Sequence, residues 1–189
     1  MQKLIIILVA TCLAASAGTI SGKVAAGKGS SVVWVEAIAG KTFPPPSKTQ
    51  VMDQKALLFQ PHVIAVQVGT TVEFLNSDTA QHNVFWPAIS GNKKLGHNLG
   101  TWPTGEKRTF KFETPGVVPL LCNVHSEMSA FVIVSPTPYF VVTDAEGNYK
   151  IADVPNGSYS VSAWHEGAKV QSKPVSVNGD ATLDFAPSK

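Results

Sequence analysis

Short segments in which apolar and polar residues alternate follow one another along most of the chain. Residues 63–68 and 71–75 are two such segments, separated by a Gly-Thr turn, and residues 109–113 and 130–134 repeat the pattern. Successive side chains of a strand point to opposite faces, so a period of two predicts strands with one buried face. No segment has a sustained helical period, and the 13 prolines and 15 glycines suit frequent turns. We therefore predict an all-β fold with one or two sandwiches of short strands.

Two proline-bearing segments divide the chain. Residues 44–47 read Pro-Pro-Pro-Ser and residues 135–138 read Ser-Pro-Thr-Pro, which are typical of stiff connectors. Residues 47–135 between them have the size of one small sandwich. Residues 18–43 and 139–189 are each too short for a core of their own, so we predict that together they form a second, discontinuous β-sandwich. In the alternative arrangement, the N-terminal strands complete the central sandwich.

The first 17 residues have the three-part pattern of an export signal. Lys3 is their one charge, an apolar run follows, and the run closes on the small-x-small site Ala15-Ser16-Ala17. The run is too short for a membrane anchor. We predict cleavage before Gly18, a periplasmic or secreted protein, and no transmembrane segment in the mature chain. Lipid attachment at Cys12 remains an open alternative.

Export would leave Cys122 as the one cysteine of the mature chain. It cannot then form a disulfide within the chain, and is a buried thiol, an intermolecular bridge, a nucleophile or a metal ligand. The formal net charge of +2 gives no reason to expect nucleic acid or an acidic membrane surface as a partner.

The residues around this cysteine form a set of metal donors. Cys122, His125 and Met128 make a Cys-x-x-His-x-x-Met loop between two predicted strands, and His82 lies forty residues upstream of the cysteine. A thiolate, two imidazoles and a thioether suit copper as both Cu(I) and Cu(II). A tight loop can turn three side chains to one point, and a distant strand end can add the fourth. We predict one copper ion held by these four residues.

Other chemistries fit these residues less well. Zinc binds cysteine and histidine but rarely takes methionine as a structural ligand. A nucleophilic cysteine would need a histidine base and an orienting group, and Met128 would have no role, so we do not expect an enzyme. The other histidines, His62, His97 and His165, are scattered without ligand spacing. We expect them in surface or packing roles rather than in a second, catalytic copper site like that of multicopper nitrite reductases.

The segment from about residue 50 to residue 134 resembles the plastocyanin and amicyanin branch of the cupredoxins. The two-residue gap between His125 and Met128 matches the short loop of amicyanin. Further matches lie at residues 66–74, Asn76-Ser77-Asp78, His82-Asn83-Val84, Phe110-Lys111-Phe112 and Pro115-Gly116. The resemblance implies a Greek-key sandwich with a type 1 (blue) copper near one end, which transfers single electrons between redox protein partners. It also implies that His125 is the electron port in an apolar patch and that Asn83 ties the ligand strands together.

The sequence departs from that family pattern in two places. Leu120 stands where an aromatic residue is often found, and Asn123 and Val124 stand where a proline often separates the cysteine from the histidine. An N–H···S bond from Val124 would withdraw charge from the thiolate and favour Cu(I). We therefore predict a reduction potential above that of a Val124→Pro variant.

The C-terminal segment resembles the carboxypeptidase regulatory-like (transthyretin-like) β-sandwich. Its alternating strands are separated by Asp-x-x-Gly and Pro-x-Gly turns, and residues 22–37 look like the first strands of that module. The resemblance implies that this module serves in docking or gives rigidity, and that it contributes no catalytic residues. For the whole chain we predict electron transfer. The alternative is a periplasmic copper trafficking or storage module without redox turnover, which the presence of only three methionines disfavours.

Overall fold

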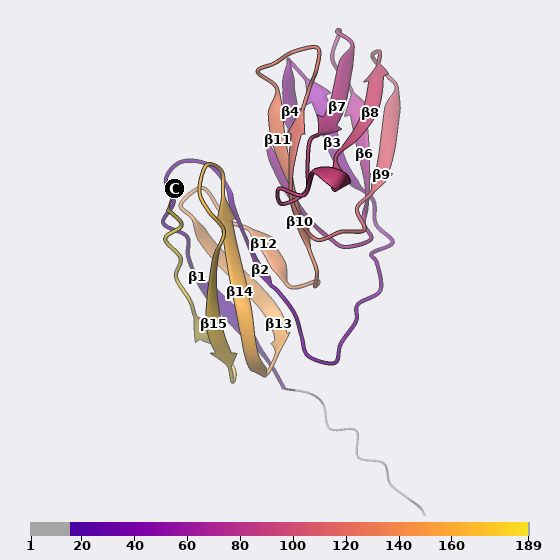
Figure 1. Cartoon of the computed structure of the whole chain (residues 1–189). Helices are drawn as coiled ribbons and strands as arrows, with labels where there is room; N and C mark the ends of the chain where they lie inside the picture. The colour runs from indigo at the N-terminus through magenta and orange to yellow at the C-terminus, as the bar shows by residue number, and fades with distance from the viewer. Residues whose placement is uncertain (1–15, 189) are drawn as a thin grey trace, which may run out of the picture.

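The computed structural model describes residues 16–188 as two lobes made of strands (Figure 1). The predicted all-β fold is confirmed: the described residues contain sixteen strands and a single-turn 3₁₀ helix, η1 (Lys93–Leu95). The predicted export signal lies outside the described residues, apart from Ser16 and Ala17. The strands are β1 (Ala17–Lys23), β2 (Ser31–Val35), β3 (Gln50–Lys55), β4 (Leu58–Gln60), β5 (Val63–Gln67), β6 (Thr71–Asn76), β7 (His82–Trp86), β8 (His97–Trp102), β9 (Lys107–Lys111), β10 (Gly116–Leu121), β11 (Ser129–Ser135), β12 (Phe140–Val142), β13 (Asn148–Pro155), β14 (Gly157–His165), β15 (Gln171–Val177) and β16 (Ala181–Thr182).

The central lobe, β3 to β11, is a sandwich of two sheets. One sheet has the strand order β4-β3-β6-β9 and the other β5-β11-β10-β7-β8. Buried and partly exposed residues alternate strictly along β6, as the period of two in the sequence predicts. The inward faces of the two sheets meet in one core, whose fully buried members include Met52, Phe74, Trp86, Trp102, Phe112 and Leu120.

The second lobe combines the two ends of the chain. Its sheets have the strand orders β13-β1-β16 and β12-β2-β14-β15. Ile20 of β1 lies opposite Ile151 of β13, and Val33 of β2 lies opposite Ala163 of β14, and all four side chains are buried in one core. The strands before the central lobe are thus hydrogen-bonded to strands that follow it.

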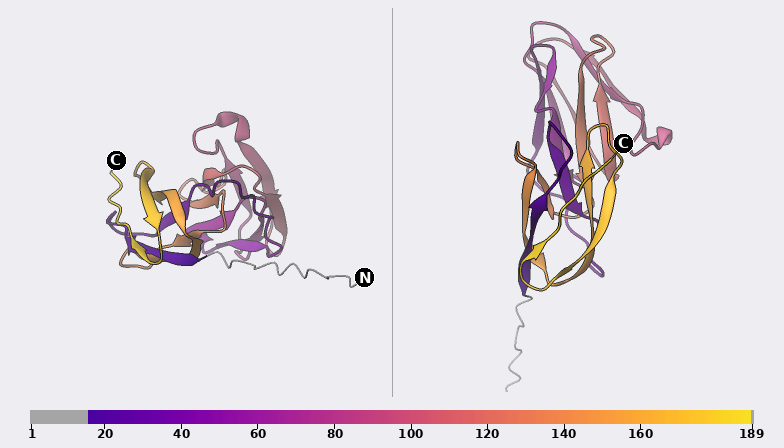
Figure 2. Two further views of the ribbon diagram at one scale, coloured as in Figure 1. Left: turned by 90° about the horizontal axis from the view of Figure 1, so that it is seen from below. Right: turned by 90° about the vertical axis from the view of Figure 1, so that its left-hand side faces the viewer.

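A third buried cluster lies between the lobes, which lie side by side in the left view of Figure 2. Val32 and Trp164 of the second lobe pack there with Val63 and Ile133 of the central lobe. The connector between β2 and β3 also lies on the central lobe, since Gln67 Nε2 donates to the carbonyl of Pro44 at 3.0 Å. Within residues 16–188, no helix has the length and apolar character needed to cross a membrane.

Candidate metal centre

Strand pairing brings the candidate ligands together at one end of the central lobe. The segment 122–128 joins the antiparallel strands β10 and β11, whose last and first residues, Leu121 and Ser129, lie opposite each other. On its other side β10 pairs with β7, which begins at His82. Cys122, which directly follows β10, therefore lies close to the first residues of β7, although forty positions separate it from His82 in the sequence.

Three of the predicted donors form a compact cluster. His82 Nδ1 lies 3.1 Å from His125 Nδ1 and 4.0 Å from Cys122 Sγ. The donor atoms of the three residues lie within 4.8 Å of one another, and the described residues contain no other such group of three His, Cys, Asp or Glu side chains. His82 is fully buried, Cys122 is 4% exposed, and His125 is half-buried.

The two separations measured from His82 Nδ1 fit one soft metal ion. Metal–nitrogen bonds of about 2.0 Å and metal–sulfur bonds of about 2.3 Å allow donor pairs around one ion to be up to about 4 Å apart. The nitrogen–nitrogen and nitrogen–sulfur distances of 3.1 Å and 4.0 Å fall within that limit. A thiol and two imidazoles, unlike a set of carboxylates, form a donor set that suits copper.

Met128 closes the ligand loop. Its backbone N–H donates to the carbonyl of His125 at 3.1 Å, so the loop ends in a tight turn. Its side chain is fully buried and belongs to the same core cluster as Cys122 and Leu120. The structure therefore places Met128 on the inner side of the loop, while Val124 is 49% exposed on the outer side.

One backbone amide reaches the cysteine sulfur, and it belongs to Asn83. The N–H of Asn83 donates to Cys122 Sγ at 3.4 Å. Among the described residues, the bond from Val124 that the sequence suggested is not present, and the Val124 side chain is 49% exposed. The structure thus provides no N–H···S bond to support the potential difference predicted for Val124→Pro.

The side chain of Asn83 connects three segments around the site. Its Nδ2 donates to Asn98 Oδ1 at 2.8 Å and to the carbonyl of Gly100 at 2.7 Å, both on β8. Its Oδ1 accepts the N–H of Asn123 in the ligand loop at 3.3 Å. Asn83 is 2% exposed, so its own side chain is shielded from water. They hold the ligand loop against β7 and β8.

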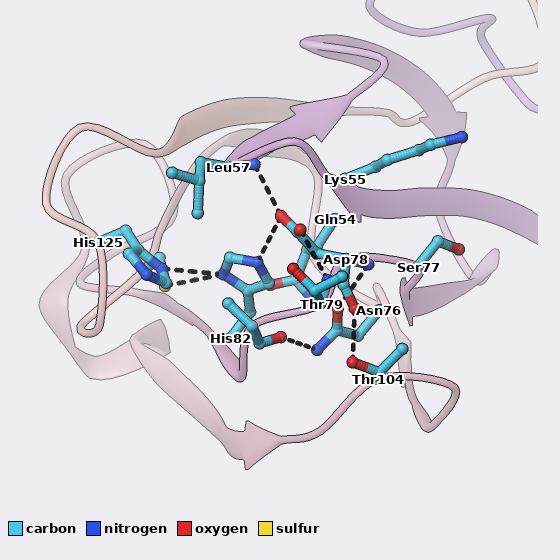
Figure 3. A network of polar contacts seen from close by, with 12 residues as sticks. Gln54, Lys55, Leu57, Asn76, Ser77, Asp78, Thr79, His82, Thr104 and His125 are labelled. Carbon is cyan, nitrogen blue, oxygen red and sulfur yellow. Dashed lines mark hydrogen bonds and ion pairs between the residues drawn. The ribbon is translucent and has the colours of Figure 1, made fainter.

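The orientation of His82 follows from a hydrogen bond on the far side of its ring (Figure 3). His82 Nε2 lies 3.1 Å from Asp78 Oδ2. Hydrogen bonds from the backbone N–H of Leu57 and from His82 lower the pKa of Asp78 to about 2, so its carboxylate is ionised at neutral pH. An ionised carboxylate only accepts, so Nε2 carries the hydrogen and Nδ1 turns its lone pair toward Cys122 and His125.

The sequence did not reveal this role of Asp78. The residue stood in a stretch that resembled the family, but an aspartate in a turn has many common uses. The one local signal is its position four residues before His82.

The three remaining histidines lie away from the cluster. His62 pairs with Glu166 at 2.7 Å between the lobes. His97 packs against Trp86 and Phe110 with tilted rings, whose centroids are 5.4 Å and 4.9 Å away. His165 is buried in the second lobe, where Nδ1 lies 3.0 Å from Ser31 Oγ. Each has a packing or hydrogen-bond partner, and none adds a donor to the metal cluster.

Comparisons with known proteins agree with this architecture. Residues 46–135 match the family of copper binding proteins described as plastocyanin/azurin, and residues 128–188 match the carboxypeptidase regulatory-like domain. Plastocyanin from Scenedesmus fuscus is 28% identical over 78 residues, which cover 39% of this chain and 80% of the plastocyanin.

Solved structures of amicyanin variants are also similar to the central part of the chain. A Cu(I) form is 21% identical with a TM-score of 0.43, and an oxidised form is 22% identical with the same score. Each match covers 46% of this chain and 82% of the amicyanin. The family matches confirm the resemblance drawn from the sequence: residues 46–135 are similar to the plastocyanin/azurin family of copper binding proteins, and residues 128–188 are similar to the carboxypeptidase regulatory-like domain.

Proposed function

We propose that this chain is an exported electron carrier, and not an enzyme, that holds one type 1 copper ion and passes single electrons between redox protein partners. The proposed ligands are His82, Cys122, His125 and Met128. The observation that carries the proposal is the convergence of two imidazole nitrogens and a thiol sulfur within 4.8 Å, in a domain of a copper-binding family. The burial of Met128 at the end of the same loop supports it as the fourth ligand.

A copper ion bound here supplies a one-electron couple between Cu(I) and Cu(II). The chain's own part is to keep the donor atoms in one arrangement. Asp78 fixes the ring of His82, Asn83 holds the ligand loop, and the core packs around Met128. Side chains fixed by packing and hydrogen bonds need to move little when the charge of the site changes.

His125 is the proposed route for electrons. It is half-buried, whereas His82, Cys122 and Met128 are buried, so its ring is the donor group nearest to solvent. Two exposed apolar side chains lie on the same side of the lobe: Val124 is its neighbour in the loop, and Leu57 points toward the cluster in Figure 3. We expect redox partners to contact this end of the central lobe.

The location and the domain boundaries belong to the same proposal. The pattern of the first 17 residues supports export to the periplasm or outside the cell. The pairing of β1 with β13 and of β2 with β14 supports a discontinuous accessory domain made of residues 18–43 and 139–189, with residues 47–135 inserted into it. The buried cluster between the lobes supports a rigid accessory domain rather than a flexible appendage.

The test is a visible spectrum of the purified protein during addition of Cu(II) and then of ascorbate. An intense thiolate-to-copper band that bleaches on reduction is expected. His125→Ala and Cys122→Ser should lose it. His62→Ala, which removes an exposed histidine outside the cluster, should keep it. A colourless protein that binds only Cu(I) would contradict electron transfer and support trafficking or storage instead.

A further inference from the structure

One carboxylate oxygen links the tip of a hairpin to a proposed metal ligand. Asp78 Oδ2 accepts a hydrogen bond from the backbone N–H of Leu57 at 2.7 Å and lies 3.1 Å from His82 Nε2 (Figure 3). Leu57 lies in the turn between β3 and β4, twenty-five positions before His82. Both contacts converge on the same oxygen, so any movement of the carboxylate changes both.

The hairpin tip has a backbone that needs such support. Ala56 and Leu57 form a two-residue turn in which both φ angles are positive, 54° and 57°. Lys55 and Leu58 on either side are paired across the strands. Asn-Gly and Gly-Gly favour such a turn, whereas alanine and leucine are disfavoured in the left-handed region because of their Cβ. The hydrogen bond to Asp78 therefore holds a turn that its own residues do not favour.

Asp78 is itself held in place, as a rigid acceptor must be. Its backbone N–H donates to Asn76 Oδ1 at 3.0 Å, and its Oδ1 accepts the N–H of Thr79 at 2.8 Å. The hydroxyl of Thr104 donates to its carbonyl. Its side chain is 12% exposed, and no lysine or arginine pairs with it among the described residues. Among the described residues, no salt bridge therefore competes with the two contacts that Asp78 Oδ2 makes to Leu57 and His82.

We propose that Asp78 is a positioning residue that couples the β3–β4 hairpin tip to His82. It keeps the hydrogen of His82 on Nε2, which leaves Nδ1 free to face Cys122 and His125, and it keeps the Ala56–Leu57 turn closed. The inference rests on the proposed function in that it takes His82 as a metal ligand. Coupling between two sites is reciprocal, so a metal that fixes His82 should also stabilise the turn.

The first test uses the full mature chain prepared without metal and compares it with Asp78→Ala by NMR. The wild type should show His82 protonated at Nε2 alone, and the Leu57 amide should exchange slowly with solvent. In Asp78→Ala the His82 proton should divide between the two nitrogens, and the Leu57 amide should exchange at least about tenfold faster.

Asp144→Ala is the matched control. Asp144 also accepts a backbone N–H, from Asn148 at 2.7 Å, but it does so in a turn of the second lobe. This variant should speed the exchange of Asn148 and leave His82 and Leu57 unchanged. If Asp78→Ala does not fold, Asp78→Asn takes its place. The loss of charge should then speed Leu57 exchange by about fivefold to tenfold.

The second test measures the affinity for Cu(I) in the presence of a competing chelator. Asp78→Ala should bind Cu(I) about 10- to 100-fold more weakly than the wild type, the usual effect of losing a hydrogen-bond partner of a ligand histidine. Cu(I) should slow Leu57 exchange in the wild type and not in Asp78→Ala.

Two different failures can be told apart. An unchanged His82 tautomer and unchanged Leu57 exchange in a folded Asp78 variant would overturn the coupling, whatever the metal does. A wild type that binds no copper would overturn the proposed function, and the measurements without metal would still decide the role of Asp78.

Discussion

Phe131 and Trp164 pack against each other with ring centroids 4.8 Å apart, although they belong to different lobes. Phe131 lies on β11 of the central lobe, and Trp164 lies on β14 of the second lobe. Next to them, His62 Nε2 and Glu166 Oε2 are hydrogen-bonded at 2.7 Å across the same boundary. Residues joined in one buried cluster lose their contacts together, so the two lobes are expected to unfold as one cooperative unit.

Trp164→Ala should break that unit. Trp164 is 4% exposed, and truncation of a buried tryptophan removes about 3–5 kcal/mol of unfolding free energy. Calorimetry should show one transition for the wild type and two for the variant. Glu166→Gln is the control, because a contact between two side chains as exposed as His62 and Glu166 contributes at most about 1 kcal/mol. If Trp164→Ala instead unfolds in a single transition at a lower temperature, the lobes are coupled through other contacts.

Substitutions of Met128 should separate packing from metal binding. Met128→Leu nearly conserves the volume of a fully buried side chain and should cost less than about 1.5 kcal/mol of unfolding free energy, whereas Met128→Ala should cost about 2–5 kcal/mol. If the thioether is a copper ligand, Met128→Leu should still change the reduction potential, because the axial ligand tunes it. Chemical denaturation and voltammetry check the two effects. An unchanged potential would leave Met128 as a core residue only.

Asn83→Ala should loosen the ligand loop. The substitution removes the partner of the Asn123 N–H and of the Gly100 carbonyl, which belong to exposed residues. The net loss of such a hydrogen bond costs about 0.5–1.5 kcal/mol of unfolding free energy. Chemical denaturation measures this cost. The control is Asn178→Ala, at an exposed asparagine of the second lobe, which should leave the free energy of unfolding nearly unchanged. Equal costs for both variants would contradict the role of Asn83.

Glu36 should make the stability of the second lobe depend on pH. The hydroxyl of Ser162 donates to its carboxylate and lowers its pKa below 4.5, with smaller contributions from Ser160 and Ser172, while burial acts in the opposite direction. A carboxyl group whose pKa is lower in the folded state stabilises the fold above its unfolded pKa, and this stabilisation is lost as the pH falls through the folded pKa. Wild type should therefore lose more stability than Glu36→Gln between pH 5 and pH 3. If the unfolding free energies of wild type and Glu36→Gln decrease equally as the pH falls, Glu36 makes no such contribution.

Much of the architecture could be predicted from the sequence because strands and ligand loops are local patterns. The alternation in residues 63–68 and 71–75 places β5 and β6 within a residue of their observed ends, since side-chain direction in a strand depends only on position. The Cys-x-x-His-x-x-Met spacing marked the ligand loop for a similar reason. Seven consecutive residues between two paired strands have little freedom to point elsewhere.

The tertiary structure decided what depends on residues far apart in the sequence. Strand pairing placed β1 and β2 beside strands that follow the central lobe, and it brought His82 next to Cys122. The amide that reaches the sulfur is that of Asn83 rather than Val124, and the oxygen that orients His82 belongs to Asp78. Residue type and spacing show which atoms can donate or accept, but the partner of each is the atom that folding brings within about 3 Å.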